Sequence, residues 1–299
     1  MIRRKNPDVL VLDRSSLLHA RVERQNGHRN LSRARVYRLG DETFTADAIS
    51  PSLSSRGSLE QAIRRMRAEA GEMEQVFLLL PDTWFRLGIL EMPSLPDRRQ
   101  EADELVRWTF RRTFPGRPED LRMTWQAVGR ENGTTRVVAA GAAEKTLRDI
   151  EQTLAAQEIH VSLIEPTGLN IWNAFASREP SSGAARMFLY LREEEFTMAL
   201  FSGSMPLFHR SRMLSAERPL EQELKLSASY VRTKLQPIRP ESCLLASNVA
   251  EAGIEELIEQ SFGAPLRRIA LSDFGIQPRQ FDAAEREIEL LACLGVHSS

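Results

Sequence analysis

The stretch Asp8-Val-Leu-Val-Leu-Asp13-Arg-Ser-Ser-Leu17-Leu-His-Ala-Arg-Val-Glu-Arg24 decides the fold that we expect. Residues 8–13 form the continuous apolar run that is typical of a buried strand, and residues 14–16 have the composition of a turn. Residues 17–24 then return as a second strand beside the first. The sequence therefore predicts an opening β-hairpin, followed by further strands at 33–39 and 42–49.

The same pattern recurs in the second half of the chain. Residues 178–185, Arg-Glu-Pro-Ser-Ser-Gly-Ala-Ala, have the composition of a linker. Three successive strands are predicted after it, at 186–192, 196–201 and 205–212. A long helix follows, with Leu220, Leu224, Ala228, Val231 and Leu235 on one face. The two halves therefore indicate a duplicated α/β architecture.

Each half is completed by helices and later strands. In the first half, Ser58-Leu-Glu-Gln61 has the pattern of a capping box, and the helix that it predicts ends at Gly71. A strand at 75–80 follows, and residues 97–165 have the order helix, strand, strand, helix, strand, which predicts a compact α+β unit. In the second half we expect a strand at 243–246, a helix at 254–262, a strand at 266–271 and a last helix at 283–294.

The composition excludes several classes of protein. The 299 residues include 40 basic and 41 acidic side chains, so the net charge of −1 provides no overall field for nucleic acid. The apolar runs have the length of strands, whereas a membrane helix needs about 20 residues, and no signal peptide is expected. Two cysteines, Cys243 and Cys293, suit a reducing compartment. We therefore expect a cytoplasmic protein.

Motifs for catalysis are scarce. Residues 141–146, Gly-Ala-Ala-Glu-Lys-Thr, match only the last pair of a phosphate-binding P-loop. The five histidines lack the spacing of metal ligands, and both cysteines are predicted to be small core residues. The carboxylates at 103–104 and 193–195 are best interpreted as solvated surface. Residues 1–38 hold ten basic and three acidic residues, which leaves open either solvated strand edges or a contact with an acidic partner or lipid headgroups.

Several longer strings resemble a known family. The duplicated strand pattern and the inserted unit are similar to the actin-like ATPase fold and, more closely, to the PilM family of type IV pilus assembly proteins, with its relatives in type II secretion. Leu90-Glu-Met-Pro-Ser-Leu-Pro96 resembles the entry into that family's inserted subdomain, and residues 104–115, 137–146 and 159–169 resemble its helix and its exit. Residues 202–212 resemble a hairpin of the second domain.

This resemblance implies a fold class and a domain organisation. The chain would be an α/β (α+β) protein of two duplicated actin-like, ribonuclease H-like domains with a small inserted α+β subdomain. The first domain would span 1–177 with the insertion at about 92–165, and the second would span 178–299. The last helix, 283–294, would pack back on the first domain.

The resemblance also points to altered nucleotide-binding positions. In actin-like ATPases, two hairpins with Asp-x-Gly hold the phosphates and magnesium, because glycine lets backbone amides approach closely. The first hairpin here has Asp13 but Ser15 and Ser16 instead of glycine, and the second has Tyr190 and Arg192. Ser247 and Asn248 stand at the adenosine-side turn. Because a non-glycine residue in a glycine conformation costs about 1–3 kcal/mol, we expect ATP binding to be lost and no cofactor to be present.

The implied function is docking. The chain would be a cytoplasmic scaffold of an inner-membrane pilus or secretion platform. It would be a pseudo-ATPase that binds the short cytoplasmic tail of a PilN-like membrane protein and other platform proteins. It would be peripheral to the membrane through that partner and would bind no nucleic acid. Leu105, Trp108 and Arg112 share a helix face with an aromatic anchor and a cation, and they are the predicted partner contacts; ordinary packing between subdomains is the alternative role for them.

Two other functions stay open at this point. The chain could be an active ATPase or sugar-kinase-like enzyme of the same fold, with Asp13, Ser15 and Ser16 in an unusual phosphate site and with ATP and magnesium as cofactors. It could also be the cytoplasmic domain of a type II secretion platform protein.

Overall fold

The first of two similar sheets contains the opening strands. The computed structural model describes residues 8–25, 28–45, 47, 51–114, 120–131, 133–179, 183–192, 194–235, 238–249 and 253–296. Strands β1 (Asp8–Leu12), β2 (Ser16–Gln25) and β3 (His28–Arg38) form an antiparallel meander, and β4 (Gln75–Leu80) and β8 (His160–Pro166) extend it in parallel. The sheet order is β3-β2-β1-β4-β8. The predicted hairpin is confirmed.

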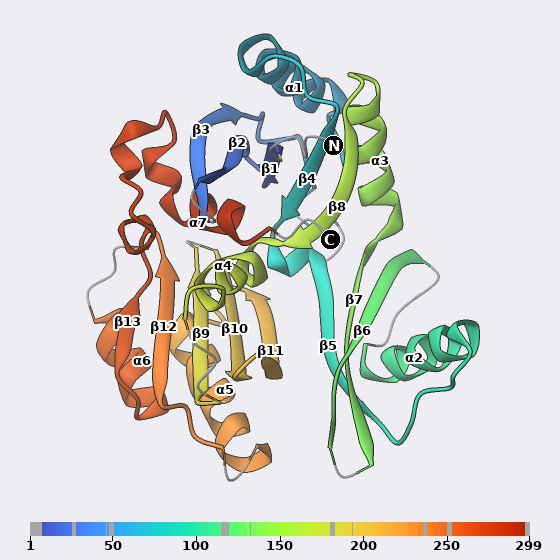
Figure 1. The fold of residues 1–299 in the computed structure, drawn as a ribbon, viewed down its shortest axis with the longest axis vertical. Helices are drawn as coiled ribbons and strands as arrows, with labels where there is room; N and C mark the ends of the chain where they lie inside the picture. The colour runs from blue at the N-terminus through green and yellow to red at the C-terminus, as the bar shows by residue number, and fades with distance from the viewer. Residues whose placement is uncertain are drawn as a thin grey trace. The chain divides into compact units, whose positions relative to one another are not determined.

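The second sheet repeats this arrangement. Its strands are β9 (Ala185–Leu191), β10 (Glu195–Ser202), β11 (Met205–Met213), β12 (Ser242–Ser247) and β13 (Leu266–Arg268), in the order β11-β10-β9-β12-β13. The first three are antiparallel, and the last two add in parallel. Strand for strand, this is the connectivity of the first sheet (Figure 1). The predicted duplication is therefore confirmed.

Helices occupy corresponding places in the two halves. The α-helices outside the insertion are α1 (Arg56–Ala70), α3 (Glu144–Ala155), α4 (Thr167–Ala176), α5 (Leu220–Lys234), α6 (Ile254–Phe262) and α7 (Glu287–Gly295). Short 3-10 turns lie at Asp82–Trp84, Leu271–Phe274, Pro278–Gln280 and Ala284–Arg286. The helices α1 and α5 follow the two meanders, and α4 and α7 follow the last strand of each sheet.

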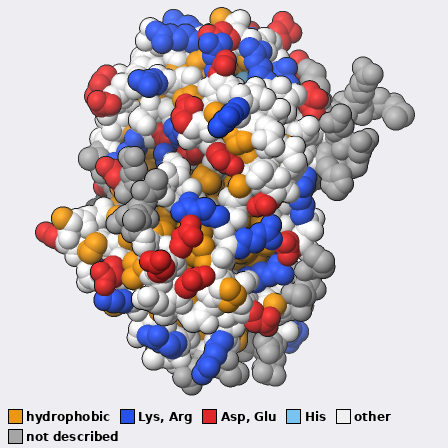
Figure 2. Space-filling model, turned by 90° about the vertical axis from the view of Figure 1, so that its left-hand side faces the viewer, with side chains coloured by type: hydrophobic (Ala, Val, Ile, Leu, Met, Phe, Trp, Pro, Cys, Tyr) orange, Lys and Arg blue, Asp and Glu red, His pale blue; other side chains and the backbone are white. Residues whose placement is uncertain are grey.

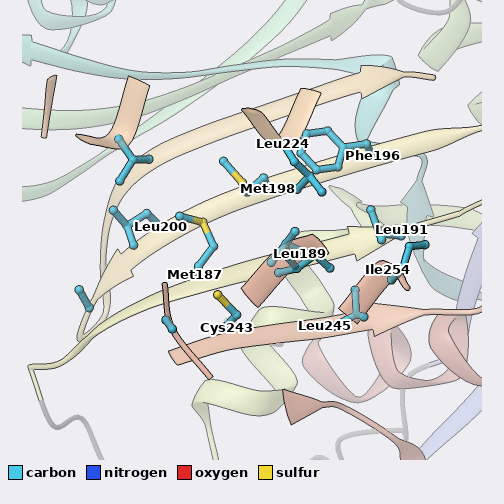
Figure 3. Packing of buried hydrophobic residues seen from close by; sticks show 14 residues of the cluster. Met187, Leu189, Leu191, Phe196, Met198, Leu200, Leu224, Cys243, Leu245 and Ile254 are labelled. Carbon is cyan, nitrogen blue, oxygen red and sulfur yellow. The ribbon is translucent and has the colours of Figure 1, made fainter. Parts of the chain in front are cut away.

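The core of the second sheet lies between its strands and two helices. Met187, Leu189 and Leu191 of β9 alternate with residues that face the other way, and they pack with Leu224 of α5 and Ile254 of α6 (Figure 3). Every second residue of a strand points to the same face of the sheet. The apolar stripes of the two helices cover this face and bury it.

The inserted segment forms a small sheet with one helix. Strands β5 (Phe85–Met92), β6 (Leu121–Glu131) and β7 (Thr134–Ala143) are antiparallel in the order β5-β7-β6, and α2 (Arg99–Thr113) belongs to the same unit. Val106 and Phe110 of α2 share a buried cluster with Val137 and Ala139 of β7, so this helix covers one face of the sheet.

Two compact units are distinguished by their internal packing. One consists of Met1–Asp82, Lys145–Pro180 and Ile269–Ser299, and the other of Thr83–Glu144 and Ser181–Arg268. The inserted strands thus group with the second sheet, and α7 groups with the first. This division by packing does not test the predicted domain boundary at 177–178 or the predicted insertion limits of about 92–165. Both stay predictions.

Some local predictions were wrong. The described residues within 42–49 form no strand beyond an isolated bridge from Phe44 to Leu53, while residues 46 and 48–50 lie outside the described part. The capping box is not formed, because α1 begins at Arg56 and the Oγ of Ser58 accepts hydrogen bonds from Gly40 N and Thr43 Oγ1, each at 2.9 Å. The strand expected at 266–271 ends at Arg268.

The helices α4 and α7 pack against each other within the first unit, at a point where a side chain has no room. A Cβ atom at Gly295 would overlap the carbonyl oxygen of Asn170 and would stand 3.0 Å from the backbone nitrogen of Ala174. Gly295 therefore sets how closely these helices approach.

We predict that Gly295→Ala lowers the free energy of unfolding by about 1–3 kcal/mol, because the added methyl group forces the two helices apart. Urea denaturation followed by circular dichroism measures the change. Gly57→Ala is the matched control, since nothing lies within 4 Å of a Cβ there in helix α1, and it should stabilise by up to about 1 kcal/mol. Equal stability of the Gly295→Ala variant and the natural chain would contradict this packing.

Candidate functional site

The turn between β1 and β2 closes on the carboxylate of Asp13. Its Oδ1 accepts hydrogen bonds from the backbone N–H of Ser15 at 2.9 Å and of Ser16 at 2.7 Å. The hydroxyls of the same two serines donate to this oxygen at 3.2 and 3.1 Å. Four donors of its own turn therefore converge on one oxygen of Asp13.

The other oxygen of Asp13 is held by an arginine from the far end of the chain. Nη2 of Arg286 lies 2.5 Å from Asp13 Oδ2, and Nη1 donates to Ser16 Oγ at 2.7 Å. The same guanidinium lies 3.0 Å from Oε1 of Glu289. The side chains of Asp13, Glu289 and Arg286 are 5%, 0% and 14% exposed, so the cation is nearly enclosed between two carboxylates.

This arrangement does not fit a magnesium–phosphate group. The amides that would cradle a phosphate donate to Asp13 instead, and the carboxylate that would face the metal already contacts a guanidinium. The turn also lacks the glycine conformation, because among the described residues Glu158 is the one non-glycine residue with a positive φ. We expected backbone strain at Ser15, and this prediction was wrong. Ser15 does not have the positive φ that favours glycine, so serine fits this turn without strain.

The second hairpin likewise uses its amides internally. Arg192 N donates to Glu195 O at 2.9 Å, and Leu214 N donates to Glu194 O at 2.8 Å. Tyr190 is buried in β9. The carboxylate of Glu195 is also buried and accepts a hydrogen bond from Thr83 Oγ1 at 3.2 Å, so it is not the solvated surface that we expected.

At the third predicted position, Ser247 and Asn248 end strand β12. The Oγ of Ser247 accepts a hydrogen bond from Val249 N at 3.0 Å, and the Ser247 carbonyl accepts one from Arg268 at 3.2 Å. Ser247 is buried and Asn248 is exposed. The serine is therefore occupied with its own loop.

The three predicted partner contacts lie on helix α2. Leu105 is partly buried against the cluster under the helix, whereas Trp108 is 55% exposed. The guanidinium of Arg112 stands 4.9 Å from the centre of the Trp108 ring. Trp108 and Arg112 thus form one exposed pair, whereas Leu105 packs within its own unit.

The remaining candidates have structural partners. His19 is fully buried, with Nε2 2.8 Å from Asp8 Oδ1, and Arg21 binds the same oxygen at 3.0 Å. Burial raises the pKa of Asp8, but the hydrogen bonds from His19 and Arg21 outweigh it and hold that pKa below its usual value. Both cysteines lie in the core, as predicted, and burial raises the pKa of the Cys243 thiol to about 12.

Several basic residues in the described part of the N-terminal segment have internal partners, while residues 1–7 lie outside that part. Arg21 pairs with Asp8, Arg35 lies 2.9 Å from Glu69, and Arg29 donates to the carbonyls of Leu294 and Val296 at the end of α7. Figure 2 shows basic and acidic side chains interspersed over one face of the molecule. These contacts favour the structural interpretation of the basic segment.

Two further observations concern metal ligands and membrane-spanning helices. In the described part of the chain, no three His, Cys, Asp or Glu side chains gather as metal ligands would. The described helices include none with the length and apolar character needed to cross a bilayer.

Comparisons with known proteins support the fold. Neither the family models nor the curated proteins match this sequence. Among solved structures, the chain is similar to a "PilM-PilN type IV pilus biogenesis complex", with 18% identity, a TM-score of 0.77, and coverage of 99% of this chain and 100% of that one.

Two further solved structures have the same fold. One is a Bacteroides thetaiotaomicron protein described as having an actin-like ATPase fold, with a TM-score of 0.56, 11% identity, and coverage of 99% and 100% of the two chains. The other is the cytoplasmic domain of EpsL of Vibrio cholerae, with a TM-score of 0.53, 12% identity, and coverage of 98% and 96%. The chain therefore has the duplicated actin-like fold that the sequence predicted.

We predict that Arg286→Gln lowers the free energy of unfolding by about 3–5 kcal/mol, because it leaves two buried carboxylates without their shared cation. Adding Asp13→Asn should restore part of this loss, with a coupling energy of about 1–3 kcal/mol. Chemical denaturation measures both values. Arg64→Gln is the control, because that arginine belongs to an exposed pair with Glu60 and should change stability by less than about 1 kcal/mol. A stable Arg286→Gln variant would show that the ion pair is not formed.

Proposed function

We propose that this chain is a cytoplasmic scaffold of an inner-membrane pilus or secretion platform, and that it works by docking partners without binding ATP. Its main partner would be a PilN-like membrane protein whose short cytoplasmic tail binds beside the inserted subdomain. Other platform proteins would attach to the same scaffold. The protein would thus lie at the inner face of the membrane through its partner.

Similarity over the whole chain supports the platform role. The PilM–PilN structure matches end to end, and the domain of EpsL, named as an inner-membrane component of type II secretion, shares the fold. Because one fold serves many functions, this similarity alone does not identify the activity. The contacts at Asp13 supply the second part of the proposal.

The loss of ATP binding is inferred from the donors around Asp13. Any phosphate bound there would have to displace both serine amides from the Asp13 carboxylate, and any magnesium ion would have to displace Arg286. Micromolar binding corresponds to only about 8 kcal/mol, and breaking a buried ion pair costs about 3–5 kcal/mol. About 3–5 kcal/mol would remain, which corresponds to an affinity in the millimolar range.

The outer face of α2 is the proposed contact for the tail. Among the residues that the structure describes, Trp108 is the most exposed large apolar side chain, ahead of Leu226 and Tyr230. Tryptophan and arginine are among the residue types that contribute most of the binding energy at protein–protein interfaces. Leu105 and Arg112 flank Trp108 on this helix, and we propose them as the neighbouring contacts.

We predict that a peptide with the N-terminal cytoplasmic tail of the neighbouring PilN-like protein binds this chain in solution, and that Trp108→Ala weakens binding about 30-fold, the loss of a typical hot spot. Fluorescence anisotropy of a labelled peptide measures the affinity. Tyr230→Ala is the matched control, because Tyr230 is 46% exposed on helix α5, and it should bind normally. Mg-ATP should leave the affinity unchanged. Absence of peptide binding to the natural chain would refute the docking role.

A further inference from the structure

We propose that two copies of this chain associate through the exposed side of helix α5, with the two helices antiparallel. Leu226 and Tyr230 form the centre of the contact, and a two-fold axis relates the two surfaces. The inference is independent of the proposed function, because α5 packs on the second sheet whereas α2 belongs to the inserted unit. The two helices can therefore be altered separately.

The exposed surface of α5 is divided into a charged edge and an uncharged strip. Successive residues of a helix are about 100° apart, so the exposed residues Glu221, Lys225 and Arg232 lie along one edge. The uncharged strip beside this edge consists of the exposed residues Gln222, Leu226, Ser229, Tyr230 and Thr233. Charged residues are depleted at the centre of protein interfaces, and the rim is polar. The uncharged strip therefore has the composition of an interface centre.

The apolar part of the uncharged strip extends onto the neighbouring strand. Leu226 and Tyr230 are 47% and 46% exposed, and residues four apart are neighbours on a helix surface. The centre of the Tyr230 ring lies 5.3 Å from that of Phe208 on β11, which packs against the core of the second sheet. The three side chains thus form one apolar patch, in which Phe208 supports the exposed tyrosine.

The charges on α5 favour a second copy as the occupant of this patch. Glu221 lies in the first turn and pairs with Lys225 at 2.5 Å. Arg232 lies about three turns later on the same edge. In the part of the chain that the structure describes, Arg232 has no acidic partner. One end of the charged edge therefore carries an acid and the other end an unpaired cation.

Antiparallel pairing matches both ends of this edge at once. A two-fold axis places the same surface of each copy against the other, so Glu221 of each copy approaches Arg232 of the other. With Leu226 of each copy against Tyr230 of the other, Glu221 and Arg232 differ by about 4.5 Å along the helix axis, which their long side chains span. Parallel helices would oppose like charges and like dipole ends. A partner with charges of one sign would match only one end.

Sedimentation equilibrium of the whole chain alone tests this inference. We expect a reversible dimer with a dissociation constant of about 10 μM, at the weak end of the range for specific interfaces. Leu226→Lys should weaken dimerisation about 30-fold, the loss of a typical hot spot, because it places two cations at the centre of the contact. Trp108→Ala is the matched control, since Trp108 is 55% exposed on α2, and it should dimerise like the natural chain. Circular dichroism checks that both variants are folded.

A charge exchange tests the antiparallel arrangement. Arg232→Glu removes the cation opposite Glu221, and Glu221→Arg removes the acid opposite Arg232. Each variant alone should dimerise about tenfold more weakly at low salt, because like charges then meet at both ends. An equal mixture of the two variants restores two attractive pairs in the mixed dimer, so it should dimerise as tightly as the natural chain.

Several outcomes would overturn the inference. They are a natural chain that stays monomeric, full dimerisation of Leu226→Lys, loss of dimerisation in Trp108→Ala, and a mixture that pairs no better than its components. The docking role is judged by peptide binding. Peptide binding by a monomeric chain refutes self-association alone, and dimerisation without peptide binding refutes the docking role alone.

Discussion

A carboxylate can accept only a limited number of hydrogen bonds. In this protein the carboxylate of Asp13 already accepts them from other residues of the same chain. One oxygen receives four donors from the turn, and the other faces Arg286. Because the ion pair of Asp13 and Arg286 is buried, removing either partner would leave the other charge unpaired and shielded from water, which is strongly destabilising. The Asp13 carboxylate is therefore occupied by its own turn and by an internal cation.

The rest of the first unit supports this closure. Arg286 belongs to the segment that leads into α7, and α7 packs on α4 where Gly295 permits close approach. Arg29 of β3 binds the carbonyls at the other end of α7. The helix is thus held at both ends, which fixes the guanidinium beside Asp13. Under the proposed function, the first unit would serve as a rigid support for docking.

Much of the fold was predictable because it depends on local patterns. The two meanders rest on strand periodicity, and the structure confirms them. The compact unit expected at 97–165 is wrong in its composition, because β8 joins the first sheet and α3 groups with it, while β5 pairs with β7 in the small sheet. Helix α4 was not predicted, because nearly every side is buried, with Asn170, Ile171, Trp172 and Phe175 among its buried residues, so it lacks an amphipathic period. Ser58 was misinterpreted because it bonds to the preceding loop rather than capping a helix.

The candidate site was predictable only in part. The sequence shows that serine stands at position 15 where the resemblance implies glycine. It does not show the conformation of the turn, which avoids a positive φ at Ser15 and so carries no strain there. Arg286 was missed because 273 residues separate it from Asp13, and no local pattern marks a contact over that distance. The Arg-x-x-Glu spacing of Arg286 and Glu289 was the one available signal.

A crystal structure of the chain grown with magnesium and a non-hydrolysable ATP analogue tests the central claim most directly. We expect Arg286 to remain on the Asp13 carboxylate, with the serine amides still turned toward it and no nucleotide bound there. Ordered phosphates on the amides of Ser15 and Ser16, with Arg286 displaced, would contradict the account.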